Sequence, residues 1–290
     1  MTMMTTNHLV FPARQAGDEL PLVALHASAS TGGQWRALAE ALAGQRQVVT
    51  PDLPGYGIAQ QEIDWRSWRG QDPVSLAGEA EHVLRSVGGA ASGFHLVGHS
   101  FGGAVALKLA LCHPQRVRSL TLIEPVLFHL LLRGSDGDMR LYREVQDLRD
   151  RVRGAVAAGR PAYGMAGFVD FWNGPGAWEA ADAVQRQRLA AQARAVLRNF
   201  FAVLGETWPP EKLARLPMPV LTITGSESPA VTRRLVERIV DTAPNVTSAL
   251  VFGAGHMAPI THGETVNCLI EQHLRRSEPV AVLRSSPAAA

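Results

Sequence analysis

A serine in a glycine-rich turn, Gly98-His99-Ser100-Phe101-Gly102, is the strongest chemical signal in the sequence. It follows the apolar run Phe94–Gly98, which favours a strand, and precedes Gly102–Cys112, whose pattern is helical. A serine between a strand and a helix stands on a sharp turn, where side chains at the glycine positions would clash. The turn exposes the hydroxyl and places the Phe101 N–H where it can donate to a developing oxyanion. We therefore predict acyl transfer with Ser100 as nucleophile and Phe101 as an oxyanion donor.

Three further residues that follow apolar runs could complete such a site. His256, in Gly253-Ala254-Gly255-His256-Met257, comes directly after the last run and can act as the base for a serine. Glu124 ends an earlier run and needs a partner, because burying an unpaired carboxylate is costly. Glu227 lies in Gly225-Ser226-Glu227-Ser228-Pro229. A carboxylate would orient the histidine and stabilise its charged form. We favour Glu124 as this acid and keep Glu227 as the alternative.

The elements that position these residues follow from the hydrophobic pattern. Short apolar runs rich in β-branched residues predict strands at Leu20–His26, Gln47–Leu53, Phe94–Gly98, Arg118–Ile123, Val220–Thr224 and Ser248–Phe252. Helical patterns lie between them at Gln34–Ala43, Val74–Val87, Gly102–Cys112, Val231–Thr242 and Glu264–Arg275. Strands that are apolar without alternation are typical of a parallel sheet covered by helices on both faces. The succession predicts an α/β fold with a doubly wound, mostly parallel sheet.

One connection, from Pro125 to Pro217, is too long for a simple crossover and should be structured in its own right. Helical patterns at Asp138–Ala157 and Ala180–Leu204 predict a helical cap, residues 126–217, inserted after the sixth strand of the core. The core then comprises the segments on either side of the cap, residues 1–125 and 218–276. The remaining residues, 277–290, are predicted to be a flexible C-terminal tail.

The predicted cap is rich in aromatic residues, holding 10 of the 18 in the chain. Such residues can form the cap's own small core, or they can face the sheet and line an apolar substrate pocket. We name Phe171, Trp172 and Trp208 as pocket candidates, together with His99 beside the predicted nucleophile.

The motifs resemble those of the α/β-hydrolase superfamily, and the resemblance covers nearly the whole chain apart from the cap. His26-Ala27-Ser28 stands where the family has His-Gly followed by the second oxyanion donor, which implies the Ser28 N–H as that donor. The family places its catalytic histidine on the loop after the last strand, which implies His256. Its acid usually follows the seventh strand, where this chain has Ser228, but some members carry it after the sixth strand, where Glu124 stands.

The resemblance implies a serine hydrolase that cleaves a small carboxylic ester or thioester through a Ser-His-Glu triad and an acyl-enzyme. The alternative on the same fold is a carbon–carbon bond hydrolase or lyase, and a non-catalytic ligand receptor is a third hypothesis. We expect a small apolar acyl substrate and no cofactor, because neither zinc-type histidine spacing nor a phosphate-binding glycine loop occurs.

Composition argues against other classes of protein. The formal net charge is only +2, so no strong field attracts nucleic acid or anionic lipid. No apolar run approaches 18 residues, and the N-terminus, Met1–His8, lacks the basic and apolar regions of a secretory signal. We therefore expect a cytoplasmic protein, a monomer or homodimer, with neither nucleic acid nor membrane as partner.

Overall fold

The computed structural model describes residues 3–5, 8–11, 19–64, 74–88 and 93–278. Within them lies an eight-stranded sheet in the order β1-β2-β4-β3-β5-β6-β7-β8. The strands are β1 (Met3–Thr5), β2 (His8–Phe11), β3 (Leu22–Leu25), β4 (Val48–Pro51), β5 (Phe94–His99), β6 (Val117–Ile123), β7 (Val220–Gly225) and β8 (Val246–Val251). Strands β3 to β8 run parallel, whereas β1 and β2 pair antiparallel at one edge. The predicted doubly wound, mostly parallel sheet is confirmed.

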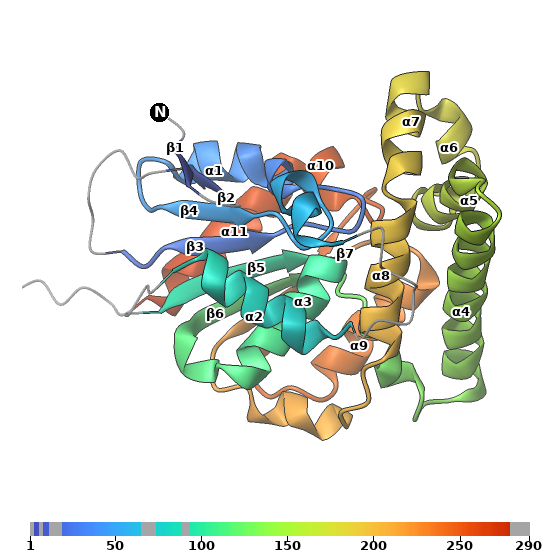
Figure 1. Ribbon diagram of the computed structural model, residues 1–290. Helices are drawn as coiled ribbons and strands as arrows, with labels where there is room; N and C mark the ends of the chain where they lie inside the picture. The colour runs from blue at the N-terminus through green and yellow to red at the C-terminus, as the bar shows by residue number, and fades with distance from the viewer. Residues whose placement is uncertain (1–2, 6–7, 12–18, 65–73, 89–92, 279–290) are drawn as a thin grey trace, which may run out of the picture.

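Helices cover both faces of the sheet (Figure 1). On one face lie α1 (Arg36–Leu42), α10 (Ala258–Thr261) and α11 (Gly263–Ser277), and on the other α2 (Leu76–Ser86), α3 (Phe101–Cys112) and α9 (Ala230–Val240). Short 3₁₀ helices complete the connections: Gly32–Trp35, Gly57–Glu62, Pro114–Arg116, Phe128–Leu131 and Pro210–Arg215.

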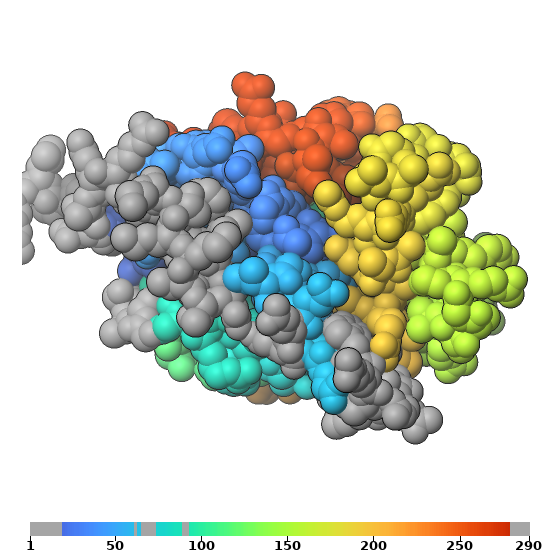
Figure 2. Space-filling view, turned by 45° about the horizontal axis from the view of Figure 1, so that its top comes forward, coloured from blue at the N-terminus to red at the C-terminus, as the bar shows by residue number. Residues whose placement is uncertain are grey.

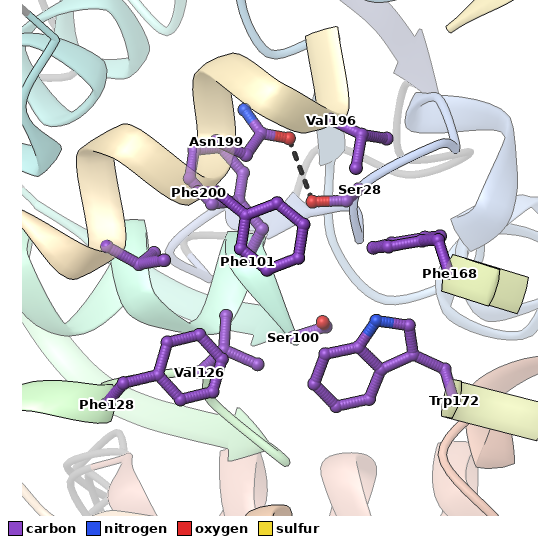
Figure 3. Close-up of a pocket in the computed structure, with 11 residues that line it drawn as sticks. Ser28, Ser100, Phe101, Val126, Phe128, Phe168, Trp172, Val196, Asn199 and Phe200 are labelled. Atoms are coloured by element: carbon purple, nitrogen blue, oxygen red, sulfur yellow. Dashed lines mark hydrogen bonds between the residues drawn. The ribbon is translucent and has the colours of Figure 1, made fainter. Parts of the chain in front are cut away.

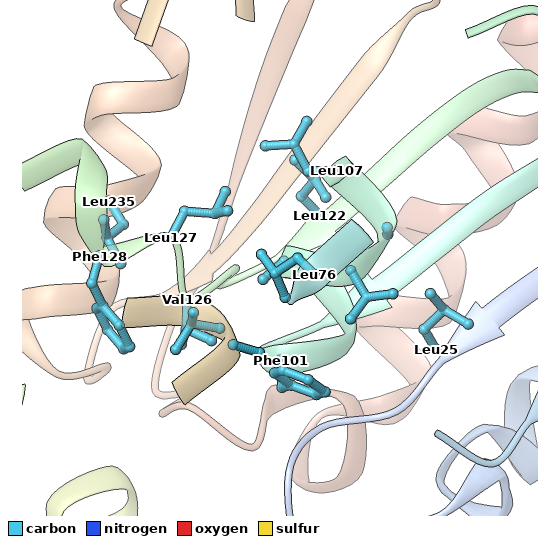
Figure 4. Packing of buried hydrophobic residues seen from close by; sticks show 14 of the residues in the cluster. Leu25, Leu76, Phe101, Leu107, Leu122, Val126, Leu127, Phe128 and Leu235 are labelled. Carbon is cyan, nitrogen blue, oxygen red and sulfur yellow. The ribbon is translucent and has the colours of Figure 1, made fainter. Parts of the chain in front are cut away.

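Alternating side chains of each strand supply the two cores that hold these helices. In β3, Leu22 and Ala24 pack with α1 and α11, whereas Leu25 packs on the opposite face with α2 and α3. Figure 4 shows part of this second core, to which Phe101 and Leu107 of α3 and Leu122 of β6 belong. Burial on both faces explains why the central strands are largely apolar and lack a regular alternation of polar residues.

A helical cap follows β6, as predicted, and stands beside the carboxyl ends of the strands (Figure 1). Its helices are α4 (Asp136–Ala157), α5 (Pro161–Asn173), α6 (Ala177–Ala180), α7 (Ala183–Ala191) and α8 (Ala193–Leu204). Two ion pairs, each with a buried carboxylate, join cap to core: Asp138 of α4 with Arg234 of α9 at 2.6 Å, and Glu79 of α2 with Arg198 of α8 at 2.5 Å. In Figure 2 the yellow cap atoms lie directly against blue atoms of the core.

The six predicted strands are β3 to β8, but several other expectations need correction. Strands β1 and β2 were not predicted, nor was α5, and the predicted helix Ala180–Leu204 is instead α7 and α8, separated at Gln192. Ser277 is the last residue of α11, and Glu278 pairs with Arg46 at 2.5 Å, so neither belongs to a tail. The rest of the predicted tail lies outside the described residues. Among those described, no helix is long and apolar enough to span a membrane.

The close approach of α3 to β3 depends on Gly102. A Cβ there would lie 2.5 Å from the carbonyl oxygens of Leu25 and His26. We expect Gly102→Ala to lower the melting temperature by several degrees, since overpacking a rigid backbone contact costs about 1–3 kcal/mol. Gly154→Ala is the matched control, because it lies in α4 with open space at its Cβ position. It should raise the melting temperature slightly. Equal changes in melting temperature for the two variants would contradict the role given to Gly102 in the contact between α3 and β3.

Candidate active site

Ser100 sits on the turn between β5 and α3, as predicted, with a backbone conformation that few non-glycine residues adopt. Its φ is 54° and its ψ is −116°. The surrounding chain holds it there: the Ser100 N–H donates to the Ile123 carbonyl at 2.9 Å, and its own carbonyl accepts from Ala104 at 3.1 Å. A side chain at Gly98 would collide with the Gly102 carbonyl. Strain of this kind persists where the surrounding structure enforces it, and it is concentrated at functional sites.

A chain of hydrogen bonds joins Ser100, His256 and Glu124 from three strand ends. The Ser100 hydroxyl lies 3.0 Å from His256 Nε2, and His256 Nδ1 lies 2.7 Å from Glu124 Oε2. Because an ionised carboxylate only accepts hydrogen bonds, Nδ1 carries the proton and Nε2 is free to accept from the serine. Hydroxyl, imidazole and carboxylate therefore stand in the order that covalent acyl transfer requires of a nucleophile, a base and an orienting acid.

The Glu124 carboxylate is fully buried and satisfied on both oxygens. Oε1 accepts from the Gly225 N–H at 2.9 Å, from the Thr224 hydroxyl at 3.3 Å and from the Ser228 hydroxyl. Burial alone would raise its pKa, but the bond and charge of His256, with the donors Ser228 and Gly225, lower the pKa of Glu124 to about 2. Glu124 is thus held as an anion against His256.

Glu227 and Ser228, in the loop after β7, have different surroundings from Glu124. The side chain of Glu227 is exposed, and its backbone N–H donates to the Ala254 carbonyl at 2.9 Å. Ser228 is buried and turns its hydroxyl toward Glu124. Of the two predicted acids, Glu124 is therefore the one that contacts His256.

The two predicted oxyanion donors border the same cavity as Ser100 (Figure 3). Phe101 is the first residue of α3, where N–H groups have no partner within the helix. Ser28 follows β3, and its hydroxyl donates to Asn199 of α8 at 2.8 Å. His26 braces this loop, because its Nε2 accepts from the Leu53 N–H at 2.9 Å and its Nδ1–H donates to the Ala27 carbonyl at 2.8 Å.

The hollow in front of Ser100 encloses about 280 Å³, counting the space open to solvent, and is largely apolar. Cap and core both contribute to its wall: Ser28, Ser100, Phe101, Val126, Phe128, Phe168, Trp172, Val196, Asn199, Phe200 and Val203. Apart from Ser100, its aliphatic and aromatic lining is interrupted by the polar side chains of Ser28 and Asn199, which bond to each other (Figure 3). A small apolar group is therefore the chemistry that fits beside the serine.

Of the four predicted pocket residues, Trp172 lines this cavity. Phe171 lies behind it, with its ring 4.8 Å from that of Trp172, and does not border the cavity. The prediction for Trp208 is wrong: its ring packs edge-on against His129 at 4.2 Å and borders a separate surface hollow with Lys108 and Cys112. Its indole belongs to the packing between cap and core.

His99 lies behind the catalytic candidates rather than in the cavity. The Gln34 amide donates to its Nδ1 at 3.1 Å, and its Nε2–H donates to the His256 carbonyl at 2.8 Å. Burial, followed by the nearness of His256, lowers the pKa of His99 to about 3, so it stays neutral. It fixes the backbone of the loop that carries His256.

Several cavity residues were missed by the sequence analysis, although α8 carried a signal for them. Val196, Asn199, Phe200 and Val203 follow the i, i+3, i+4, i+7 spacing of one helix face. Val126 and Phe128, directly after Glu124, carried no comparable pattern. Within the described ranges, no group of three or more histidine, cysteine or acidic residues is arranged to hold a metal ion.

Comparison with known proteins places this geometry in context. Residues 22–267 match the profile of the Alpha/beta hydrolase family. The chain is 28% identical over 250 residues to a putative carbamate hydrolase, RutD, of Azorhizobium caulinodans, covering 83% of this chain and 85% of the relative. It is 29% identical over 255 residues to the pimeloyl-[acyl-carrier protein] methyl ester esterase of Xanthomonas campestris, covering 84% and 91%. The structure of MenH from S. aureus superposes with a TM-score of 0.72 at 17% identity, covering 95% of this chain and all of that one (100%).

Proposed function

This chain belongs to the alpha/beta hydrolase family, and we propose that it is a serine hydrolase that cleaves a small carboxylic ester or thioester. The observation that carries the proposal is the hydrogen-bonded chain Ser100–His256–Glu124 opening on an apolar cavity. A hydrolase named for a methyl ester among its relatives supports the ester class. A receptor that only binds its ligand would not need these three groups in contact.

The proposed reaction is acyl transfer to water in two steps. Ser100 attacks the carbonyl carbon as His256 Nε2 takes the hydroxyl proton, and Glu124 stabilises the resulting imidazolium. The N–H groups of Ser28 and Phe101 stabilise the oxyanion. The C–O or C–S bond of the ester then breaks, and His256 returns the proton to the leaving group. Water, deprotonated by His256, attacks the acyl-enzyme, the bond to Ser100 Oγ breaks, and His256 returns the proton to Oγ as the acid leaves. Every proton transfer uses His256, so no metal or cofactor enters the scheme.

We further propose that residues 126–217 act as a unit that sets substrate preference. The turn around Ser100 performs the same chemistry for any ester, whereas the cap supplies much of the cavity wall, from Phe168 to Val203. A wall of aromatic and aliphatic side chains close around Ser100 favours a short, uncharged acyl group.

A panel of p-nitrophenyl esters and matching thioesters of graded acyl length tests this proposal. We expect turnover that is highest for short acyl chains, with a burst of p-nitrophenol as the acyl-enzyme accumulates. Absence of turnover on every ester and thioester, by folded protein whose Ser100 still reacts with a fluorophosphonate, would contradict the ester proposal. The carbon–carbon hydrolase alternative would then take its place.

Enlarging the cavity should change chain-length preference. Phe200→Ala removes a ring from the wall near Ser100, so we expect the optimum of the ester panel to move to longer acyl chains. Trp208→Ala is the matched control, because its indole is equally buried but lies outside the cavity. It should lower the melting temperature and leave the preference unchanged. The same shift in both variants would refute the assignment of this cavity to the acyl group.

A further inference from the structure

A tryptophan of the cap lies flat on the ring of His256. The ring centroids of Trp172 and His256 are 4.5 Å apart and their planes are inclined by 26°. Trp172 comes from α5 and His256 from the loop after β8, so two distant parts of the chain meet in this stack. Trp172 and His256 are 6% and 3% exposed, which keeps water from the contact. Figure 3 shows the indole beside Ser100 among the residues that line the cavity.

The neighbours of Trp172 fix the angle of its ring. Phe168 lies at 6.2 Å and Phe171 at 4.8 Å, each edge-on to the indole. Edge-to-face contacts of this kind resist rotation of the ring. The face of Trp172 is therefore held toward His256 before any substrate arrives.

The face of an indole carries negative charge density and attracts a cation that lies within about 6 Å of its centre. The attraction is about 0.5–1 kcal/mol at exposed sites and about 2 kcal/mol where water is excluded. When His256 takes the Ser100 proton in the proposed reaction, it becomes such a cation. An interaction that appears with the charge lowers the barrier rather than the energy of the bound substrate.

The other groups around His256 do not stack on the face of its ring. Glu124 meets the Nδ1 edge of the ring, and the Ser100 hydroxyl meets the Nε2 edge. The ring of His99 lies 5.1 Å away at 46° and is neutral, because burial lowers its pKa. Among the contacts found in the described part of the chain, the Trp172 face is the π-surface stacked on His256.

We propose that Trp172 is a positioning residue whose indole face stabilises the imidazolium formed at His256 during catalysis. The inference rests on the proposed serine-hydrolase function and deepens it, because the cap then takes part in the chemical step as well as forming the cavity wall. A residue that served only as wall would change how substrates bind. Trp172 should instead change how readily His256 holds a proton.

Variants at Trp172 and at a neighbouring wall residue separate these two roles. We expect Trp172→Leu to lower kcat on p-nitrophenyl acetate by about 2- to 30-fold, the range that corresponds to the cation–π energy. The acidic limb of the kcat/KM profile should move to lower pH, because the protonated histidine loses its support. Trp172→Phe should restore much of both. Phe128→Leu is the matched control: it lines the same cavity and, within the described part of the chain, makes no ring contact with Trp172 or His256, so it should alter KM and leave the acidic limb in place.

A shape-preserving change keeps the test valid even where Trp172→Leu folds poorly. Fluorinated tryptophan withdraws charge from the ring face, so incorporation into wild-type protein should move the acidic limb to lower pH. Incorporation into Trp172→Phe protein should not. An acidic limb that stays in place in both Trp172→Leu and fluorinated wild type would overturn the inference. The rate of fluorophosphonate reaction at Ser100 provides the same pH profile without any ester, and a wild type that neither reacts nor hydrolyses would count against the proposed function instead.

Discussion

Replacing Ser100 by alanine is expected to remove nearly all hydrolysis while leaving the fold intact. The hydroxyl is the group that His256 Nε2 contacts at 3.0 Å, and the cavity offers no second nucleophile in contact with that nitrogen among the described residues. Loss of a nucleophile costs several orders of magnitude in kcat, and a residual acceleration of about 10³–10⁴ over water remains from the oxyanion donors and from binding. The rate on the best ester of the panel, measured beside a thermal melt, checks the prediction.

Ser248→Ala is the matched control for this change. It is an exposed serine on β8, away from the strand ends that carry the site, and should keep full activity. A Ser100→Ala protein that melts normally and retains more than a few per cent of the wild-type rate would show that acyl transfer does not pass through this residue.

The second large effect is expected from Glu124→Gln. Glutamine keeps the size of the side chain and can still accept from the Gly225 N–H, but it removes the negative charge that faces His256 Nδ1 at 2.7 Å. The imidazolium then loses its counter-charge, and an amide can also stabilise the wrong tautomer of the histidine. We expect kcat to fall by about 10²–10⁴-fold, as when a triad acid is neutralised.

Glu227→Gln provides the comparison within one experiment. Its carboxylate is exposed, so neutralising it should leave kcat within a factor of about two, as for most surface changes. Steady-state kinetics of both variants on one ester decide between the acids. Should Glu227→Gln lower kcat more than Glu124→Gln, Glu227 would be the acid that acts on His256. Glu124 would then be only a buried residue at the end of β6.

The central sheet and the three strand-end residues were accessible from sequence because their signals are local. Strands buried on both faces read as continuous apolar runs, and β5, with the run Phe94–Gly98, is the clearest of them. Parallel strands bring their carboxyl ends to one edge, so Ser100, Glu124 and His256 could be expected together without knowledge of any distance.

Other features depend on contacts that no local pattern contains. The two short N-terminal strands have too few residues for a periodic signal. Helix α5 begins at Pro161 and holds Gly164 and Gly167, which weaken a helical reading, although Gly164 is needed where the helix packs on Val152.

Aromatic content predicted a pocket but could not select its members. Trp172 and Trp208 are both buried cap residues, and their sequence surroundings do not say which one faces Ser100. That depends on how the cap helices are rotated on the core, which the ion pairs of α4 and α8 and the packing of α5 decide together. The stack of Trp172 on His256 is likewise a product of tertiary structure.

The most direct measurement is covalent labelling of the protein with a fluorophosphonate, followed by mass mapping of the modified peptide. Serine attack on phosphorus requires an activated hydroxyl, and it needs no knowledge of the natural substrate. We expect one adduct, on Ser100, formed rapidly by wild type, slowly by Glu124→Gln and not at all by Ser100→Ala. Unmodified wild-type protein, or an adduct on any other residue, would contradict the assignment of Ser100 as an activated nucleophile.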